Sequence, residues 1–197
     1  RCFHKQHIET IRDLPGISDE QKNRLLRIFE IKKGESYLDV GAYMGYGTVR
    51  MAKELGNGSK IIAVEADSDS QWLLKKNIEV NNLTNVLIIP VAVNNFDGTA
   101  SFYTSRRQVN SLISNIVPSQ NAIKMSTLTI DSILNAAGVK SVNRISITIN
   151  GAEVEAIEGM KEAVERSEYL RISMAGWYQR GHQRISDIVA PVLQGYG

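Results

Sequence analysis

Cysteine is almost absent from the sequence, which holds one residue of this type, Cys2, among 197. A single thiol excludes an internal disulfide framework and a zinc site built from several cysteines. It fits a reducing compartment, so we expect a cytoplasmic location. Long apolar stretches are lacking too, since none approaches the ~20 residues that a membrane span needs, and no secretory signal is recognisable at the start. We therefore expect no membrane partner.

An excess of charge of either sign is also lacking, because the formal net charge is only +2. A general polyanion binder needs a clustered basic surface, and the tight basic pair in an expected loop is Arg106-Arg107. A nucleic-acid partner is therefore not expected, although this pair could recognise an anionic substrate. Hydrophobic residues make up 43% of the chain, which is enough for one core of ordinary size.

What the sequence does hold is a regular alternation of short apolar segments with helical patterns. Strands separated by helices of this length form βαβ units, in which a parallel sheet is covered on both faces. The expected fold class is therefore α/β, with a doubly wound, mostly parallel, Rossmann-like sheet. Strands are predicted at 36–42, 60–66, 86–93, 144–150 and 169–176, and helices at 46–56, 69–82, 129–138, 152–167 and 184–195, the last broken by Pro191.

The start of the chain has a different character. Residues 17–30 are predicted to form a helix that opens with a capping box, in which Ser18 and Gln21 satisfy each other's backbone amides. We treat residues 1–33 as an N-terminal helical extension and residues 34–197 as the main domain.

The middle of the chain is less regular. Residues 96–104 carry an Asp-Gly turn followed by alternating residues, which indicates an added strand near an edge of the sheet. Residues 105–126 are rich in Ser, Asn and Gln and show little periodicity. They are predicted to form a long loop over a functional region.

A glycine-rich stretch, LDVGAYMGYGTV (38–49), follows the first predicted strand. A dinucleotide site would need the pattern G-x-G-x-x-G, but counting from Gly41 meets Tyr43 and Tyr46, and counting from Gly45 ends on Arg50. No Gly-Lys-Ser/Thr follows, so a Walker loop is excluded as well. The loop is not built for phosphate, which disfavours a nicotinamide-dependent oxidoreductase.

Two acidic residues lie at the ends of neighbouring predicted strands. Asp39 precedes the glycine loop and could take the ammonium group of an amino acid, directly or through water. Glu65 ends the next strand, where a carboxylate can accept both hydroxyls of a ribose. An acid for an ammonium, an acid for a ribose and no seat for phosphate fit S-adenosylmethionine, whose sulfonium is attracted to acidic and π-rich walls.

The sequence also resembles the FkbM-type S-adenosylmethionine-dependent methyltransferases from about Tyr37 to Met160. The resemblance implies cofactor contacts at Gly41, Gly45 and Glu65, and methylation of hydroxyl groups on small molecules and sugars. The full predicted cofactor-binding set is Asp39, Gly41, Ala42, Tyr43, Gly45, Glu65, Ala66 and Ala92. The matching blocks are YLDVGAYMGYGT (37–48), AVEADSDSQWLLKKNIEVNN (63–82), TLTIDSIL (127–134) and INGAEVEAIEGM (149–160).

The chain departs from the family's pattern in three places. Tyr43 stands where the family usually has Asn. The family's Lys-x-Asp-x-Glu-Gly is replaced by Ser146, Thr148 and Asn150 before Gly151, three neutral residues that share one face of a strand. The family's sheet gains two more strands after the last helix, whereas this sequence ends there. We therefore expect five main parallel strands rather than seven.

Candidate catalytic residues follow the fourth and fifth predicted strands. A hydroxyl acceptor benefits from a general base. His182 is the candidate base, although an exposed loop histidine explains it equally simply. Glu153 keeps the family's position and could orient a substrate, or it could serve only the helix dipole. Asp131 is a further candidate, but Thr-x-Asp at a helix start is typical of a cap.

No metal is expected. His4 and His7 lie three residues apart, but without acidic neighbours at ligand spacing. Two functional alternatives stay open beside methylation of a small molecule or glycan. One is a degenerate relative that binds the cofactor without catalysis. The other is an RNA or protein methyltransferase, which would need a basic face around Arg106, Arg107, Arg180 and Arg184.

Overall fold

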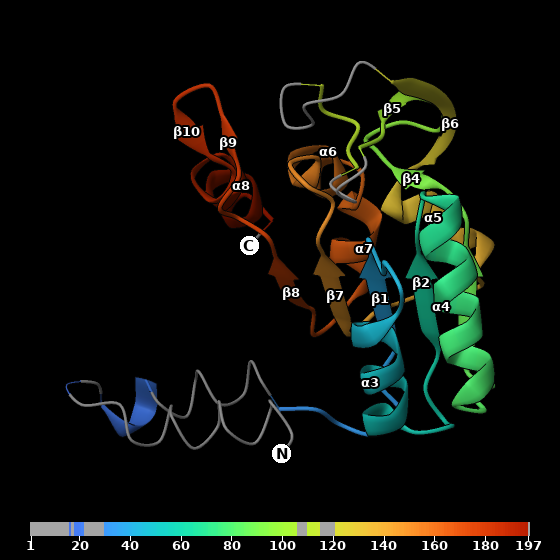
Figure 1. Cartoon of the computed structure of the whole chain (residues 1–197). Helices are drawn as coiled ribbons and strands as arrows, with labels where there is room; N and C mark the ends of the chain where they lie inside the picture. Colours follow the sequence, from blue (N-terminus) through green and yellow to red (C-terminus); the bar gives the residue numbers. More distant parts are fainter. Residues whose placement is uncertain (1–15, 17, 22–29, 106–109, 115–120, 197) are drawn as a thin grey trace. The chain divides into compact units, whose positions relative to one another are not determined.

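The computed structural model describes residues 16, 18–21, 30–105, 110–114 and 121–196 (Figure 1). The chain divides into two compact units, residues 1–32 and 33–197. In the first unit, Ser18 N donates to Gln21 Oε1 at 2.8 Å, and Gln21 N donates to Ser18 Oγ at 3.2 Å. The predicted capping box is therefore confirmed, while most of the helix predicted to follow it lies outside the described residues.

The second unit is built on a five-stranded sheet in which every neighbouring pair is parallel (Figure 1). The order β3-β2-β1-β7-β8 reverses direction between β1 and β7. Ligands of open α/β sheets bind at this kind of switch point, outside the carboxyl ends of the strands. The predicted fold class and the five parallel strands are confirmed. The strands are β1 Tyr37–Val40, β2 Ile61–Val64, β3 Val86–Ile89, β7 Arg144–Ile147 and β8 Arg171–Met174.

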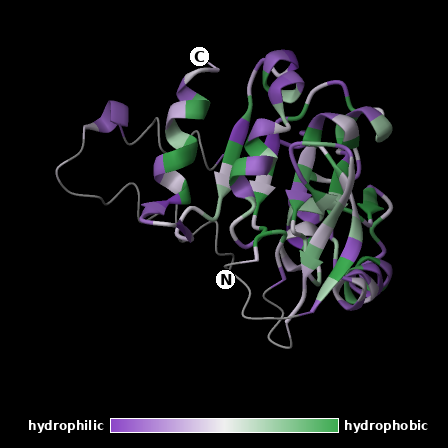
Figure 2. Ribbon diagram, turned by 90° about the horizontal axis from the view of Figure 1, so that it is seen from above, coloured by the Kyte–Doolittle hydropathy of each residue, from purple (hydrophilic) through white to green (hydrophobic). Residues whose placement is uncertain are grey.

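Helices cover both faces of this sheet, and Figure 2 shows them flanking the strands with mixed hydrophobic and hydrophilic residues. One face carries the larger core, in which Val40, Val64 and Ile147 pack with residues of the last four helices. The other face carries a smaller cluster, in which Ala63 packs against Leu74. Burial on both faces explains why β1 and β2 are continuously apolar apart from Asp39. The helices are α3 Tyr46–Leu55, α4 Ser68–Val80, α5 Ile130–Ala136, α6 Glu153–Glu158, α7 Lys161–Arg166 and α8 Ile185–Gln194.

The strand predicted at 86–93 divides in two, which corrects the prediction. β3 ends at Ile89, and β4 (Ala92–Val93) joins a separate three-stranded sheet with the order β4-β6-β5. Pro90 lies between the two strands and has no N–H to continue the ladder. The small sheet lies at the end toward which the main strands point (Figure 1).

The middle of the chain is also more ordered than predicted. β5 (Gly98–Tyr103) is the expected added strand, but it pairs antiparallel with β6 (Ala122–Leu128) and not with the main sheet. The long-loop prediction for 105–126 is therefore wrong from Ala122 onward. The polar composition that suggested a loop fits β6 because most of this strand is exposed.

The helix predicted at 152–167 divides into α6 and α7 at Gly159. A Cβ on Gly159 would lie 2.7 Å from the Asn94 carbonyl oxygen, so the chain passes too close to continue as one helix with a side chain there. Asp131 caps α7 by accepting from the amides of Glu162 and Ala163, at 3.0 and 2.8 Å. The capping reading of Asp131 is correct, but the helix that it caps is not its own.

The last helix is not broken at Pro191, contrary to the prediction. α8 is continuous through Pro191, which is exposed together with Asp187, so solvent is available where the helical hydrogen bond is lost. Before α8, β9 (Gln179–Arg180) and β10 (Gln183–Arg184) form a short antiparallel hairpin. None of the helices in the described part of the chain has the length and apolar character that a bilayer crossing demands.

The loop after β1 packs tightly against the end of β7. Gly41 has φ of 80°, and a Cβ at this position would lie 2.1 Å from the Thr148 carbonyl oxygen. Only glycine allows both the left-handed backbone and this close approach. Gly41 thus brings the carboxyl ends of two central strands together.

We predict that Gly41→Ala lowers the free energy of unfolding by about 2–4 kcal/mol, because the added methyl strains the backbone and collides with the Thr148 carbonyl. Urea unfolding measures the change. Gly58→Ala is the matched control, since nothing lies within 4 Å of its Cβ and its φ is outside the left-handed region; about 0.5 kcal/mol or less is expected there. Equal stability of the two variants would contradict the close packing.

Candidate active site

A cavity of about 350 Å³ opens at the carboxyl ends of the central strands. This volume lies within the range of small-molecule sites. Its walls come from the loops after β1, β2 and β7, from β4 and β5, and from residues 110–112, which we call the strap. The residues used below are Gly41, Tyr43, Glu65, Ala66, Asp67, Ala92, Phe102, Asn110, Leu112, Thr148, Ile149 and Asn150.

The Glu65 carboxylate is fixed at the wall of this cavity by two backbone amides. Its Oε2 accepts from Tyr43 N at 2.7 Å, and its Oε1 accepts from Asp67 N at 2.9 Å. Burial raises the pKa of Glu65, while the amides of Asp67 and Tyr43 oppose this shift. Each oxygen keeps a further lone pair, so the carboxylate can accept two more hydrogen bonds from a ligand.

Five of the eight predicted cofactor-binding residues line the cavity, namely Gly41, Tyr43, Glu65, Ala66 and Ala92. Ala42 and Gly45 do not, because they face α4. A Cβ on Gly45 would lie 2.5 Å from Leu74 Cδ1, and Ala42 belongs to the apolar cluster around Leu74.

The glycine loop is also tied to α4 by a polar contact. Asn77 Nδ2, from the middle of that helix, donates to the Met44 carbonyl at 2.7 Å. The loop residues that miss the cavity therefore position those that reach it.

Asp39 is buried below the loop and is absent from the cavity wall. Its Oδ2 accepts from Thr48 Oγ1 at 2.6 Å, which ties β1 to α3. Burial raises the pKa of Asp39, and hydrogen bonds from Thr48 and Tyr37 oppose the shift. The predicted contact of Asp39 with a ligand ammonium stays a prediction that this placement does not favour.

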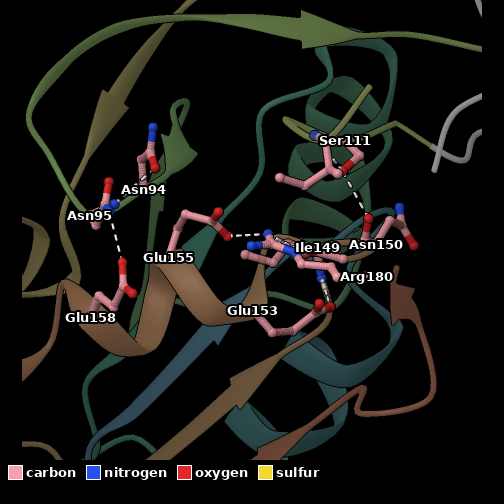
Figure 3. Close-up of polar contacts among 11 residues, drawn as sticks. Asn94, Asn95, Ser111, Ile149, Asn150, Glu153, Glu155, Glu158 and Arg180 are labelled. Carbon is pink, nitrogen blue, oxygen red and sulfur yellow. Dashed lines mark hydrogen bonds and ion pairs between the residues drawn. The ribbon is translucent and has the colours of Figure 1, made fainter. Parts of the chain in front are cut away.

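Neither predicted catalytic residue lines the cavity. His182 is exposed in the turn between β9 and β10. Glu153 is fully buried at the first residue of α6, and burial raises its pKa. Figure 3 shows its side chain directed at Ile149, whose amide donates to Glu153 Oε1 at 3.1 Å. Glu153 therefore supports the cavity wall from behind.

Sequence reasoning missed the strap and the role of Asp67. Asn110 Nδ2 donates to Asp67 Oδ2 at 3.0 Å, while Asp67 Oδ1 caps α4 by accepting from Ser70 N at 2.9 Å. Asp67 was predicted only as an opener of that helix. A carboxylate two residues after Glu65 was the available signal, but nothing local indicates its partner, which lies 43 residues away.

The charge of the cavity decides which cofactor it fits. Among the described lining residues, Glu65 and Asp67 are acidic and none is Lys, Arg or His. Such a wall repels phosphate and attracts a cation. A fixed carboxylate with free lone pairs suits a ribose diol, so these residues fit S-adenosylmethionine, which carries a ribose, a sulfonium and no phosphate. No cluster of three potential metal ligands occurs in the described ranges.

Comparisons with known proteins agree with this chemistry. A family model described as "Methyltransferase FkbM domain" matches residues 39–188. A protein of Sulfurisphaera tokodaii is 29% identical over 168 residues, which cover 74% of this chain and 84% of that protein. One of Sulfolobus acidocaldarius is 29% identical over 171 residues, which cover 75% and 88%. Both are named "Probable cobalt-precorrin-6B C(15)-methyltransferase (decarboxylating)".

Two solved structures share the fold at low sequence identity. The methyltransferase FkbM of Methylobacillus flagellatus gives a TM-score of 0.57 at 12% identity, covering 97% of this chain, which spans 52% of the length of that protein. The fibrillarin of Aeropyrum pernix, solved with S-adenosyl-L-methionine bound, gives 0.52 at 12% identity, covering 84% of this chain and 58% of that one.

The FkbM domain model extends over more than half of the chain and includes every main strand except its first two residues in β1. Together with a cavity whose charge suits its cofactor, this shows that the chain belongs to the FkbM methyltransferase family and is an S-adenosylmethionine-dependent methyltransferase.

Proposed function

We propose that this methyltransferase methylates a hydroxyl group of an uncharged small molecule or glycan. The observation that carries the proposal is the division of the cavity into two sides. Glu65 and Asp67 place negative charge at the end of β2, whereas the side formed after β7 is neutral and polar, with Thr148 and Asn150. The neutral side offers hydrogen-bond donors and acceptors for hydroxyl groups and no partner for a charged acceptor.

In the proposed mechanism the protein acts mainly by positioning. S-adenosylmethionine, when bound, supplies a methyl group on a positively charged sulfur. Glu65 accepts hydrogen bonds from the ribose hydroxyls, and the acidic wall favours the sulfonium. Thr148 and Asn150 orient the acceptor oxygen, which forms its bond to the methyl carbon as the carbon–sulfur bond breaks and the hydroxyl proton is released. Alignment of this kind supplies several kcal/mol, within a known limit of about 7–11 kcal/mol.

Carbon methylation is the second candidate. The described cavity wall contains no Lys or His to remove a hydroxyl proton, and its carboxylates lie on the cofactor side. A conjugated carbon acceptor needs no base at the moment of transfer. The two archaeal relatives are named for methylation at C(15), which supports this alternative.

An RNA or degenerate enzyme receives less support. Arg180, one of the four arginines that an RNA-binding face would need, donates from Nη2 to the Gly151 carbonyl at 2.7 Å and pairs with Glu155 (Figure 3). Arg106 and Arg107 lie outside the described residues. Thr148 and Asn150, which suggested degeneration, line the cavity and keep polar groups available there.

We predict that Glu65→Ala weakens binding of S-adenosylhomocysteine by about 1–3 kcal/mol, the scale of hydrogen bonds to a charged group. Isothermal titration measures the loss, and NAD, for which no binding is expected, is the control ligand. Because burial raises the pKa of Glu65, the affinity of the native chain should fall on acidification at a higher pH than an ordinary glutamate would give. Glu65→Gln should remove this pH dependence. Unchanged affinity in both variants would remove Glu65 from the site.

The proposed reaction is tested with methyl-labelled S-adenosylmethionine and a panel of hydroxylated small molecules and glycans. We expect a product with an O-methyl resonance in its NMR spectrum. A C-methyl resonance on a conjugated acceptor would replace the hydroxyl proposal by the carbon one.

The same assay tests the predicted base. If His182 removes the proton, His182→Ala must lower turnover by about 10²–10⁴-fold at unchanged S-adenosylhomocysteine affinity. Because His182 is exposed outside the cavity wall, we expect turnover near that of the native chain, which would exclude this residue. A large loss of turnover would instead show that the hairpin approaches the acceptor.

A further inference from the structure

The strap, residues 110–112, is anchored to β5 at its base. Tyr103 N donates to the Ser111 carbonyl at 2.8 Å, and Ser111 N donates back to the Tyr103 carbonyl at 3.0 Å. Ser105 N donates to Asn110 Oδ1 at 2.9 Å. These bonds fix where the strap leaves the small sheet, and they leave the Asn110 carbonyl and the Asn110 side-chain amide directed elsewhere.

One of these groups reaches the cofactor side of the cavity. Asn110 Nδ2 donates to Asp67 Oδ2, and the amide of Asp67 is the one that holds Glu65 Oε1. The strap is therefore two hydrogen bonds away from the carboxylate that we assign to the ribose.

The other group reaches the acceptor side. Asn150 Nδ2 donates to the Asn110 carbonyl at 2.9 Å, and Ser111 Oγ donates to the Asn150 carbonyl at 2.8 Å (Figure 3). Asn150 Oδ1 in turn accepts from Tyr178 Oη at 2.8 Å. Both ends of the Asn150 amide group are thus engaged, one with the strap and one with the segment after β8.

Asparagine suits this position for two physical reasons. Asn150 has φ of 53°, a left-handed conformation that asparagine tolerates better than most side chains. Its amide can also donate to one partner and accept from another. A glutamate, which the resembled family has here, is an acceptor only when ionised and could not hold the Asn110 carbonyl.

We propose that Asn150 is a positioning residue for methyl transfer: its side-chain amide donates to the Asn110 carbonyl and so holds the strap as a cavity wall coupled to Glu65 through Asp67. This inference rests on the proposed function for the identity of the bound cofactor. It makes Asn150 the adapted partner of the strap rather than a sign of lost activity.

The decisive variant is Asn150→Asp, which keeps the shape of the side chain. An ionised carboxyl at this position cannot donate to the Asn110 carbonyl, whereas a protonated one can donate while its other oxygen still accepts from Tyr178. We therefore expect S-adenosylhomocysteine to bind the variant at least ~10-fold more weakly than the native chain at about pH 8, with the ratio returning toward one near about pH 4.5.

The comparison is made as a ratio to the native chain at each pH, because other groups around Asn150 also titrate or carry charge. These are Glu65 and Asp67 in the cavity wall, Glu153 on α6, Tyr178, and Arg180 on the Gly151 carbonyl. Tyr178→Phe is the matched control. It removes the donor to Asn150 Oδ1 and spares the bond to the strap, so we expect no added pH dependence.

Two results would overturn the proposal. Native-like binding of Asn150→Asp at both pH values would show that the strap does not need the donor. Equally weak binding at both would show a general loss of structure rather than the loss of one hydrogen bond. The rescue at low pH is the result that a merely structural role would not produce.

Amide hydrogen exchange separates this inference from the cofactor assignment. Ser111 N and Ile113 N are both bonded within the strap region, the latter to Ser111 Oγ at 3.0 Å. Without any ligand, Asn150→Asp should speed their exchange relative to the native chain at about pH 8 and less so near about pH 4.5. If the native chain fails to bind S-adenosylhomocysteine, the proposed function fails, while unchanged exchange in the variant would reject the role of Asn150.

Discussion

A single buried carboxylate organises the mouth of this sheet. Glu65 accepts from the backbone of the loop after β1 through Tyr43 and from the backbone of its own loop through Asp67. Carboxylates satisfied by backbone amides are fixed in direction, and this one lies in the cavity wall. The left-handed backbone of Tyr43, with φ of 52°, persists because its amide is held in this way. Without this carboxylate, neither loop would present a defined surface to a ligand.

The polar contacts beyond Glu65 extend the same order across the cavity. Asp67 connects to Asn110, and Asn110 connects to Asn150, so the two sides of the site are linked through one short segment. Ser146, the first of the three neutral replacements, is absent from the cavity wall, whereas Thr148 and Asn150 belong to it. The replacements therefore do not act as a block. Those that face the ligand site have been kept polar, and one has acquired defined partners.

Several elements could be predicted because their causes are local. Alternating apolar segments indicated the parallel strands, and Asp67 was one of two residues expected to open α4, which it caps through Ser70. Pro90 was visible in the sequence, yet its consequence, the departure of β4 to a second sheet, depends on a partner strand 35 residues further along the chain. β6 was missed for a related reason. Its sequence is polar because it is mostly exposed, and its pairing with β5 is what makes it a strand.

The sequence by itself determined the α/β class, the glycine loop without a phosphate seat and the acid at the end of β2. These follow from periodicity, from the residues a phosphate would require and from the position of one carboxylate after a strand. Only the tertiary structure decided that Asp39 is tied to Thr48 and that the Asn110 carbonyl meets the Asn150 amide. The physical reason is distance along the chain: Asn110 and Asn150 are 40 residues apart, and no local pattern encodes a hydrogen bond that forms only when the strap and the turn after β7 are folded.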